Sequence, residues 1–198
     1  MQNGLKFLSL IGAVALSVQP VLGKWKEIAA AKPVAVAKSA MKVTAPAGWN
    51  MLSSRPIKKG EIWSFDGPIL NKIEFVAAIS PGEPIAYETD RKRKPLPKFN
   101  AAMLPTDVVQ LYEQTVRLSE GSVDFTVEEV TPTTFAGKSG FSMKFRYSRP
   151  NEELVRKGEA RGAVIGGKLY LISFTAPVLH YFDRDIAKVR TLMDSVTL

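Results

Sequence analysis

Four β-like segments follow one another between residues 125 and 175, and this run constrains the fold most strongly. The clearest segment is Phe141–Tyr147, in which three aromatic residues and a methionine alternate with serine, lysine and arginine. Such alternation predicts a strand with one buried face. The segments 160–165 and 168–175 flank Gly166 and Gly167, which form a two-residue hairpin turn. Strands joined by so short a turn run antiparallel, so the sequence predicts an antiparallel sheet.

Two amphipathic segments, one on each side of these strands, predict helices. The first covers residues 107–120, where Asp107 and Gln110 fit a capping box. The second lies between Leu179 and Val196, with apolar residues at every third or fourth position. Each helix needs a sheet face to cover its apolar side. We therefore predict an α+β fold, with an antiparallel β-sheet flanked by helices as an α/β/α sandwich.

The first half of the domain combines short strand signals with a long irregular segment. Strands are predicted near 42–46, 60–66 and 73–79, the last with one strongly apolar face made by Ile73, Phe75, Ala77 and Ile79. Residues 81–105 contain five prolines, which preclude long regular structure. Ordered loops of this length are uncommon in compact domains and are often functional. We expect the far end of this loop to be anchored on the core by Phe99, Met103 and Leu104.

The N-terminus has the layout of a secretory signal peptide. Lys6 precedes an apolar run, and small or moderate residues at 21–23 offer a cleavage site, so residues 1–23 are predicted to be removed. The apolar run of about twelve residues is shorter than the roughly 20 that span a membrane, although an uncleaved anchor remains the alternative. Residues 24–40, rich in Ala and Lys, are expected to be a flexible spacer, or else a short amphipathic helix on a membrane. One domain then covers residues 41–198.

Composition excludes several classes of chemistry. The chain of 198 residues contains one His and no Cys, so a disulfide framework, a thiol nucleophile and a multi-His metal site within one chain are excluded, and no cofactor is indicated. The formal net charge is +8, yet residues 99–198 carry twelve bases and twelve acids. The excess positive charge therefore belongs to the Lys-rich segment 24–42 and to one loop.

That loop is the candidate binding site. Residues 91–98 hold five bases and no acid, and these are Arg91, Lys92, Arg93, Lys94 and Lys98. One interpretation is a solvated loop tip. The other is contact with an anionic membrane surface or an acidic partner protein of the envelope. Nucleic-acid binding is not expected, because such proteins carry their charge on one face of the body with aromatic residues interleaved.

Other motifs were considered as catalytic sites. Residues Ala136–Ser139 are similar to the end of a phosphate loop, but Pro132 stands where the motif needs Gly and a strand follows, which predicts a turn. His180 could pair with Asp183, but it has no second His or Cys for zinc. The acids Glu61, Asp66 and Glu74 could cluster on neighbouring strands, or could simply form a solvated face.

The layout resembles the PsbP-like α/β/α superfamily, which includes bacterial envelope proteins of the DcrB type. Three places carry the resemblance: Val43–Trp49 with its Pro-x-Gly-Trp sequence, the strands through Phe141–Tyr147 and Gly167–Leu171, and the closing helix Tyr181–Ser195. It covers about residues 41–198. The resemblance implies a non-enzymatic accessory or binding role and supplies no catalytic residues. The Pro-rich basic loop departs from the simple pattern.

These observations predict an exported, non-enzymatic accessory or binding protein of the bacterial cell envelope, periplasmic or secreted and peripheral to the membrane. The alternative is an envelope hydrolase that uses Asp/Glu chemistry. A third hypothesis is a self-associating structural protein. The sequence leaves the oligomeric state and the ligand open.

Overall fold

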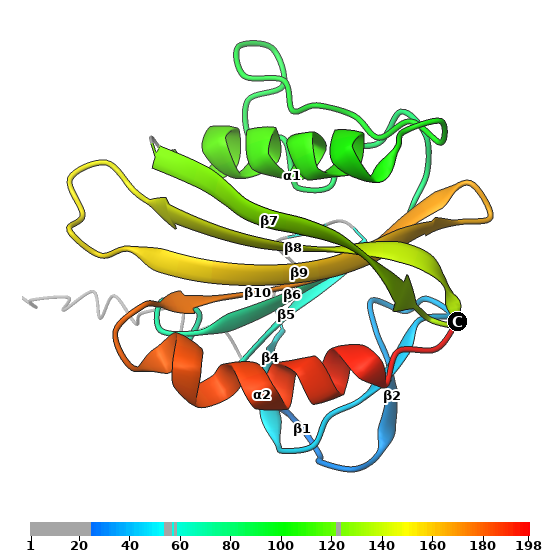
Figure 1. Cartoon of the computed structure of the whole chain (residues 1–198), viewed down its shortest axis with the longest axis vertical. Helices are drawn as coiled ribbons and strands as arrows, with labels where there is room; N and C mark the ends of the chain where they lie inside the picture. Colours follow the sequence, from blue (N-terminus) through cyan, green and yellow to red (C-terminus); the bar gives the residue numbers. More distant parts are fainter. Residues whose placement is uncertain (1–24, 54–56, 58, 122–123) are drawn as a thin grey trace, which may run out of the picture.

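Alternation of apolar and polar residues along the strands produces a sheet whose two faces are both covered. The computed structural model describes residues 25–198 except 54–56, 58 and 122–123. In this part of the chain, helices α1 (Pro105–Glu120) and α2 (Tyr181–Asp194) lie on opposite sides of the main sheet (Figure 1). The predicted α+β fold, an antiparallel sheet flanked by helices, is confirmed. The predicted signal peptide, residues 1–23, lies outside the described residues.

Among the described residues the main sheet has eight strands, and every neighbouring pair of them runs antiparallel. In spatial order the strands are β1 (Trp25–Ile28), β4 (Trp49–Leu52), β5 (Gly60–Ser64), β6 (Lys72–Ile79), β10 (Lys168–Pro177), β9 (Arg156–Ile165), β8 (Lys138–Ser148) and β7 (Asp124–Phe135). A separate pair joins β2 (Pro33–Ala35) to β3 (Lys42–Thr44). The centre of the sheet is the β6–β10 pair, in which Phe75 lies opposite Ile172.

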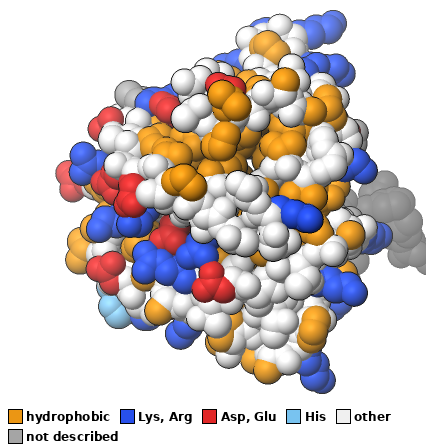
Figure 2. Space-filling model, turned by 45° about the vertical axis from the view of Figure 1, so that its right-hand side comes forward, with side chains coloured by type: hydrophobic (Ala, Val, Ile, Leu, Met, Phe, Trp, Pro, Cys, Tyr) orange, Lys and Arg blue, Asp and Glu red, His pale blue; other side chains and the backbone are white. Residues whose placement is uncertain are grey.

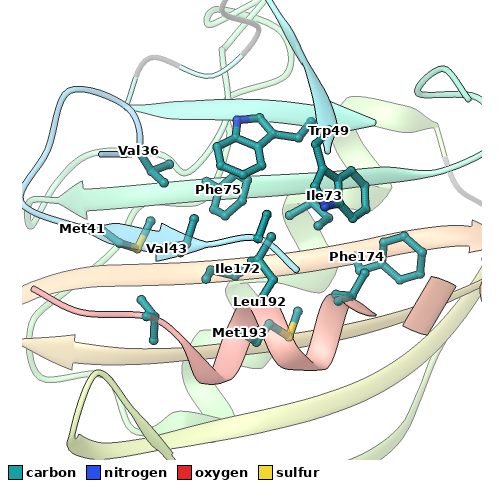
Figure 3. Close-up of a cluster of buried hydrophobic side chains, with 14 of the residues drawn as sticks. Val36, Met41, Val43, Trp49, Ile73, Phe75, Ile172, Phe174, Leu192 and Met193 are labelled. Atoms are coloured by element: carbon teal, nitrogen blue, oxygen red, sulfur yellow. The ribbon is translucent and has the colours of Figure 1, made fainter. Parts of the chain in front are cut away.

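Two hydrophobic cores lie on the two faces of the sheet, because successive side chains of a strand point to opposite sides. Leu171 belongs to the core under α1, and its neighbour Ile172 belongs to the core under α2. Figure 3 shows the α2 core, to which Trp49 from β4, Phe174 from β10 and Leu192 of the helix all belong. Both helices are therefore held by the sheet that separates them.

Residues 25–40 are part of the folded domain, so the predicted flexible spacer is wrong for these residues, as is the alternative amphipathic helix. Strand β1 pairs with β4, placing Ile28 opposite Trp49, and Ile28 is only 4% exposed. Val36 is fully buried beside Met41 in the α2 core (Figure 3). Such isolated contacts leave no periodic pattern, which is why residues 25–40 show no strand signal in the sequence.

Strand β6 contains an irregularity that the alternation did not predict. Ala78 has a positive φ of 57°, and the register with β10 shifts at this place by one extra residue on β6. This is the geometry of a β-bulge, which re-aims the side chains that follow it. As a result Ile79 packs in the α1 core, whereas Ile73 and Phe75 pack in the α2 core. The prediction of one shared face is wrong for Ile79.

Helix α1 begins two residues earlier than predicted. Leu104 is the N-cap residue and Pro105 is the first helical residue, a position where the missing N–H of proline costs nothing. Asp107 is the third helical residue, and its carboxylate accepts a hydrogen bond from the backbone N–H of the N-cap residue Leu104 at 2.8 Å. The helix ends at Gly121, whose φ of 66° is the left-handed conformation that glycine adopts without strain.

Candidate functional site

The basic loop, residues 81–105, is fastened at its base to the rest of the domain. Gly82 and Phe99 are joined by a backbone hydrogen bond of 2.8 Å, and the Phe99 N–H donates to the Glu83 carbonyl at 2.9 Å. Ile85, Leu96 and Phe99 are buried. The predicted anchor is thus confirmed for Phe99, but it is wrong for Leu104, which is 65% exposed at the helix N-cap.

The tip of this loop carries the predicted basic residues in solvent. The loop rises above α1 at the top of Figure 1, and all five bases are exposed: Arg91, Lys92, Arg93, Lys94 and Lys98. Arg93 Nε lies 2.6 Å from Asp90 Oδ2, and Arg91 Nε lies 3.6 Å from Glu88. Within the described ranges, Lys92, Lys94 and Lys98 form no ion pair.

A cavity of about 350 Å³ opens at the base of the loop, and we call it the loop-base pocket. Its polar walls come from two parts of the chain, Lys59 before β5 and residues 82–98 of the loop. Lys59 Nζ donates to Glu83 at 2.5 Å and to the carbonyl of the bulged Ala78 at 3.2 Å, so the same lysine secures the bulge and the start of the loop. Tyr87, half exposed, forms an aromatic wall. Arg91 and Lys98 also line this pocket.

Figure 2 turns the right-hand side of Figure 1 forward and shows how side chains are distributed on this face. Hydrophobic side chains gather over its upper half, while acidic and basic side chains intermingle at the left. At the top, where Figure 1 places the basic loop, the charged side chains are mainly Lys and Arg. Residues 91–98 hold five bases and no acid, so this part of the loop carries a local excess of positive charge.

A second cavity of about 300 Å³ lies between the loop and α1, and we call it the Lys72 pocket. Most of its walls are apolar, with side chains from Ile62, Val76 and Val116. Its charged residues are Lys72, Glu74 and Glu120. The Lys72 ammonium group donates to Glu74 at 3.2 Å and to Glu120 at 2.5 Å.

Lys72 and Glu120 hold each other in their ionised forms. Burial by itself lowers the pKa of Lys72, but the charges of Glu74 and Glu120 outweigh it and raise that pKa above its ordinary range. Burial raises the pKa of Glu120, but Lys72 and Arg149 outweigh this effect and lower the pKa to about 2. A carboxylate with so low a pKa carries no proton at neutral pH, so Glu120 is not suited to act as a general acid.

The three acids considered from the sequence do not come together. Glu61 on β5 lies directly opposite Phe75, so Glu74, one residue earlier on β6, points to the other face of the sheet. Glu61 accepts a hydrogen bond from Trp63 Nε1 at 3.2 Å. Asp66 lies beyond the end of β5, where its Oδ2 accepts a hydrogen bond from Asn71 Nδ2 at 2.7 Å.

The remaining motifs are parts of a turn and of a helix N-terminus. Residues 136–137 form the tight turn between β7 and β8, as predicted. His180 is exposed at the N-cap of α2, and its ring lies 5.3 Å from that of Tyr181. In the described part of the chain, no group of three or more His, Asp or Glu side chains could hold a metal ion.

The ion cluster around Lys72 was missed by sequence reasoning. Arg149 donates to Glu120 at 2.7 Å, and Tyr147 donates to the same carboxylate at 3.3 Å. Lys72 was not singled out, and Glu74 was considered only in a cluster with Glu61 and Asp66. No spacing in the sequence connects them with Glu120 at the far end of a helix, so no signal could have revealed the cluster.

Comparison with solved structures identifies the architecture. The solution structure of cyanobacterial PsbP (CyanoP) from Synechocystis sp. PCC 6803 matches with a TM-score of 0.53 and 14% sequence identity, over 95% of this chain and 98% of that chain. The chain has a PsbP-like fold. The resemblance predicted from the sequence is therefore confirmed at the level of the fold, and it extends into residues 25–40.

Another solved structure, LpqN involved in cell envelope biogenesis of Mycobacterium tuberculosis, matches with a TM-score of 0.35 and 12% identity, over 87% of this chain and 90% of that chain. The sequence matches no protein-family model and no curated protein. Among the helices that the structure describes, none has the length and apolar character needed to cross a membrane.

Proposed function

We propose that the protein is an exported, non-enzymatic accessory or binding protein of the bacterial cell envelope, attached to an anionic membrane surface through its basic loop. The observation that carries this proposal is the concentration of five bases on one raised, fastened loop. Residues 99–198 are neutral in sum, so the loop is a localised source of positive charge. The hydrophobic run before residue 23 supports export and a periplasmic or secreted location.

The energetics favour a reversible attachment. Each Lys or Arg near an anionic membrane contributes about 1 kcal/mol, so five bases hold the protein at such a surface without a hydrophobic anchor. The ion pairs of Arg91 and Arg93 do not prevent this, because exposed pairs are worth at most about 1 kcal/mol and rearrange easily. The alternative of a hydrolase loses support because the glutamates of the Lys72 pocket are bound to a protonated lysine.

Vesicle binding tests the proposal. The double variant Lys92→Glu, Lys94→Glu reverses two charges without breaking an ion pair of the loop. We expect it to bind phosphatidylglycerol vesicles more than about tenfold more weakly than the wild type, since each base contributes about 1 kcal/mol. Co-sedimentation with vesicles measures the effect. In ~1 M salt, where the Debye length is about 3 Å, binding of both proteins should disappear.

The matched control is Lys138→Glu, Lys168→Glu, which makes the same change in net charge at the exposed starts of β8 and β10. This variant should bind like the wild type within about twofold, because its charges lie outside the loop. Equal loss in the two double variants would mean that net charge alone governs binding and would contradict the proposal. So would the absence of vesicle binding by the wild type at low salt.

A further inference from the structure

The loop-base pocket places positive charge around a cavity rather than only on a convex tip. Three bases line it, namely Lys59, Arg91 and Lys98, together with the acids Glu83 and Glu88. Its volume of about 350 Å³ lies within the range of small-molecule sites. The question is which of these charges are free to meet a ligand.

The two acids of the pocket are engaged by the protein itself. Glu83 Oε2 accepts Lys59 Nζ at 2.5 Å and the Ser80 backbone N–H at 2.9 Å. Glu88 Oε1 accepts the Leu96 backbone N–H at 3.1 Å, a contact that ties the two sides of the loop together. These carboxylates fix the shape of the loop, and their charge is partly neutralised by those donors.

Two of the bases retain donor capacity. Lys98 forms no hydrogen bond or ion pair with any residue that the structure describes, and its three N–H donors remain available. Arg91 Nε stands 3.6 Å from Glu88, beyond hydrogen-bond distance, so its planar group of N–H donors is also unsaturated. The Gly82–Phe99 backbone bond brings the two ends of the loop together, and with them Lys98 and the start of the loop.

The surroundings favour an anion with several acceptor oxygens. Lys92, Arg93 and Lys94 follow Arg91 in the loop. The three bases of the pocket outnumber its two acids, so the pocket has a net positive charge that attracts an anion. Arginine and lysine together are the usual donors to phosphate oxygens. Tyr87, 49% exposed, supplies an aromatic wall for the organic part that a phosphate ester carries.

We propose that the loop-base pocket binds the phosphate group of a phosphate ester, with Arg91 and Lys98 as direct donors and Tyr87 against the attached organic part. This inference rests on the proposed function and names its ligand chemistry. The phosphate belongs either to the headgroup of a membrane lipid or to a free phosphate ester, and the two sources are separated by the experiment below.

The first arm of the experiment uses a water-soluble probe. Glycerol 3-phosphate is titrated into the full chain, and binding is measured by NMR shifts of backbone amides. Saturable shifts confined to the pocket, namely Lys59, Ile79 and residues 82–98, are expected. The variant Lys98→Gln should weaken binding about tenfold, the usual effect of removing a charged hydrogen-bond donor. The matched control Lys94→Gln, which removes a base that does not line the pocket, should change the affinity less than about twofold.

A third variant tests the direction of the electrostatics. Glu88→Gln removes a negative charge from the pocket, while its amide oxygen can still accept the Leu96 N–H. It should bind glycerol 3-phosphate more tightly than the wild type. Lys98 is exposed, and Glu88→Gln keeps the acceptor for the Leu96 N–H, so both variants are expected to fold. A wild-type amide spectrum outside the residues that line the pocket verifies this.

The second arm uses phosphatidylglycerol vesicles. If a lipid headgroup occupies the pocket, glycerol 3-phosphate will displace the wild-type protein from vesicles at constant ionic strength. If a free phosphate ester is the ligand, glycerol 3-phosphate will bind to the protein without releasing the protein from the vesicles. Vesicle binding with no saturable probe binding, or equal effects of Lys98→Gln and Lys94→Gln, would overturn the pocket inference and leave the proposed function standing. Loss of binding to vesicles and probe alike would overturn both.

Discussion

At the scale of single residues, the buried cluster of Lys72, Glu74, Glu120 and Arg149 is the most consequential feature. Lys72 is only 9% exposed, and its ammonium group has left bulk water for two carboxylates. A buried ion pair need not stabilise a fold relative to apolar residues, but removal of one partner is costly because a charge is left without compensation. The cluster also joins the end of α1 to β6 and to the end of β8.

The cluster makes stability depend on pH in a defined direction. The pKa of Glu120 falls from 4.5 to about 2 in the folded state. A lowered carboxyl pKa contributes stability above the unfolded pKa, and this contribution is lost as pH falls toward the folded pKa. Between about pH 6 and pH 3 the wild type should lose on the order of 2 kcal/mol of unfolding free energy through this group. Urea unfolding at both pH values measures the loss.

The variant Glu120→Gln should remove this pH-dependent part. We expect it to be destabilised by roughly 3 kcal/mol near neutral pH, because Lys72 and Arg149 lose a buried partner. Near pH 3 the difference from the wild type should shrink. The control Glu153→Gln changes an exposed acid that has no ion pair within the described residues, and its stability should follow that of the wild type. A constant difference at both pH values would contradict the assignment.

At the scale of elements, β1 shows that a strand without a periodic signal can still be part of the core. Ile28, 4% exposed, pairs with Trp49 across β1 and β4. Ile28→Ala should therefore lower the unfolding free energy by about 2–4 kcal/mol, the usual cost of truncating a buried isoleucine. Ile69→Ala makes the same chemical change at a side chain that is 69% exposed, and it should cost less than about 0.5 kcal/mol. Equal small effects would mean that residues 25–28 are the spacer that the sequence predicted.

The opposite edge of the sheet, β7, is protected against pairing with other chains. This edge strand has 12 residues, long enough to template another strand. Pro132 has no N–H to donate, the register with β8 shifts between Val127 and Glu129, and Glu128 adds a second acid. Bulges, prolines and charges are the usual devices that prevent edge-to-edge association. These features weigh against self-association through this edge.

At the scale of the whole molecule, the two cores share one sheet, so neither is expected to survive without the other. Trp49 and Trp63 are buried in the α2 core, whereas Tyr112 and Tyr147 are buried in the α1 core. We expect cooperative two-state unfolding, with tryptophan fluorescence, which reports on the α2 core, and amide signals of α1, which report on the other layer, giving the same midpoint. Two separate midpoints would show that the layers unfold independently and would contradict this expectation.

The sequence was sufficient for elements with a strong local pattern. The strands β8 and β10, the Gly166–Gly167 turn and helix α2 are where the alternation and the helical spacing placed them, apart from shifts at their ends. The basic loop was also located, because its charged residues are close together in the sequence. The bulge at Ala78 was not predicted, since nothing in its neighbours marks a positive φ at an alanine.

By itself, the sequence determined that the chain builds an antiparallel sheet with two covering helices and that its positive charge is concentrated at one loop, because these properties depend on local spacing. Only the tertiary structure decided which distant groups meet. It brought Lys72 to Glu120, Ile28 to Trp49, and Lys98 to the pocket that Arg91 lines. The physical reason is that such contacts depend on the packing of elements far apart in the chain, and burial then changes the energetics of the groups it brings together.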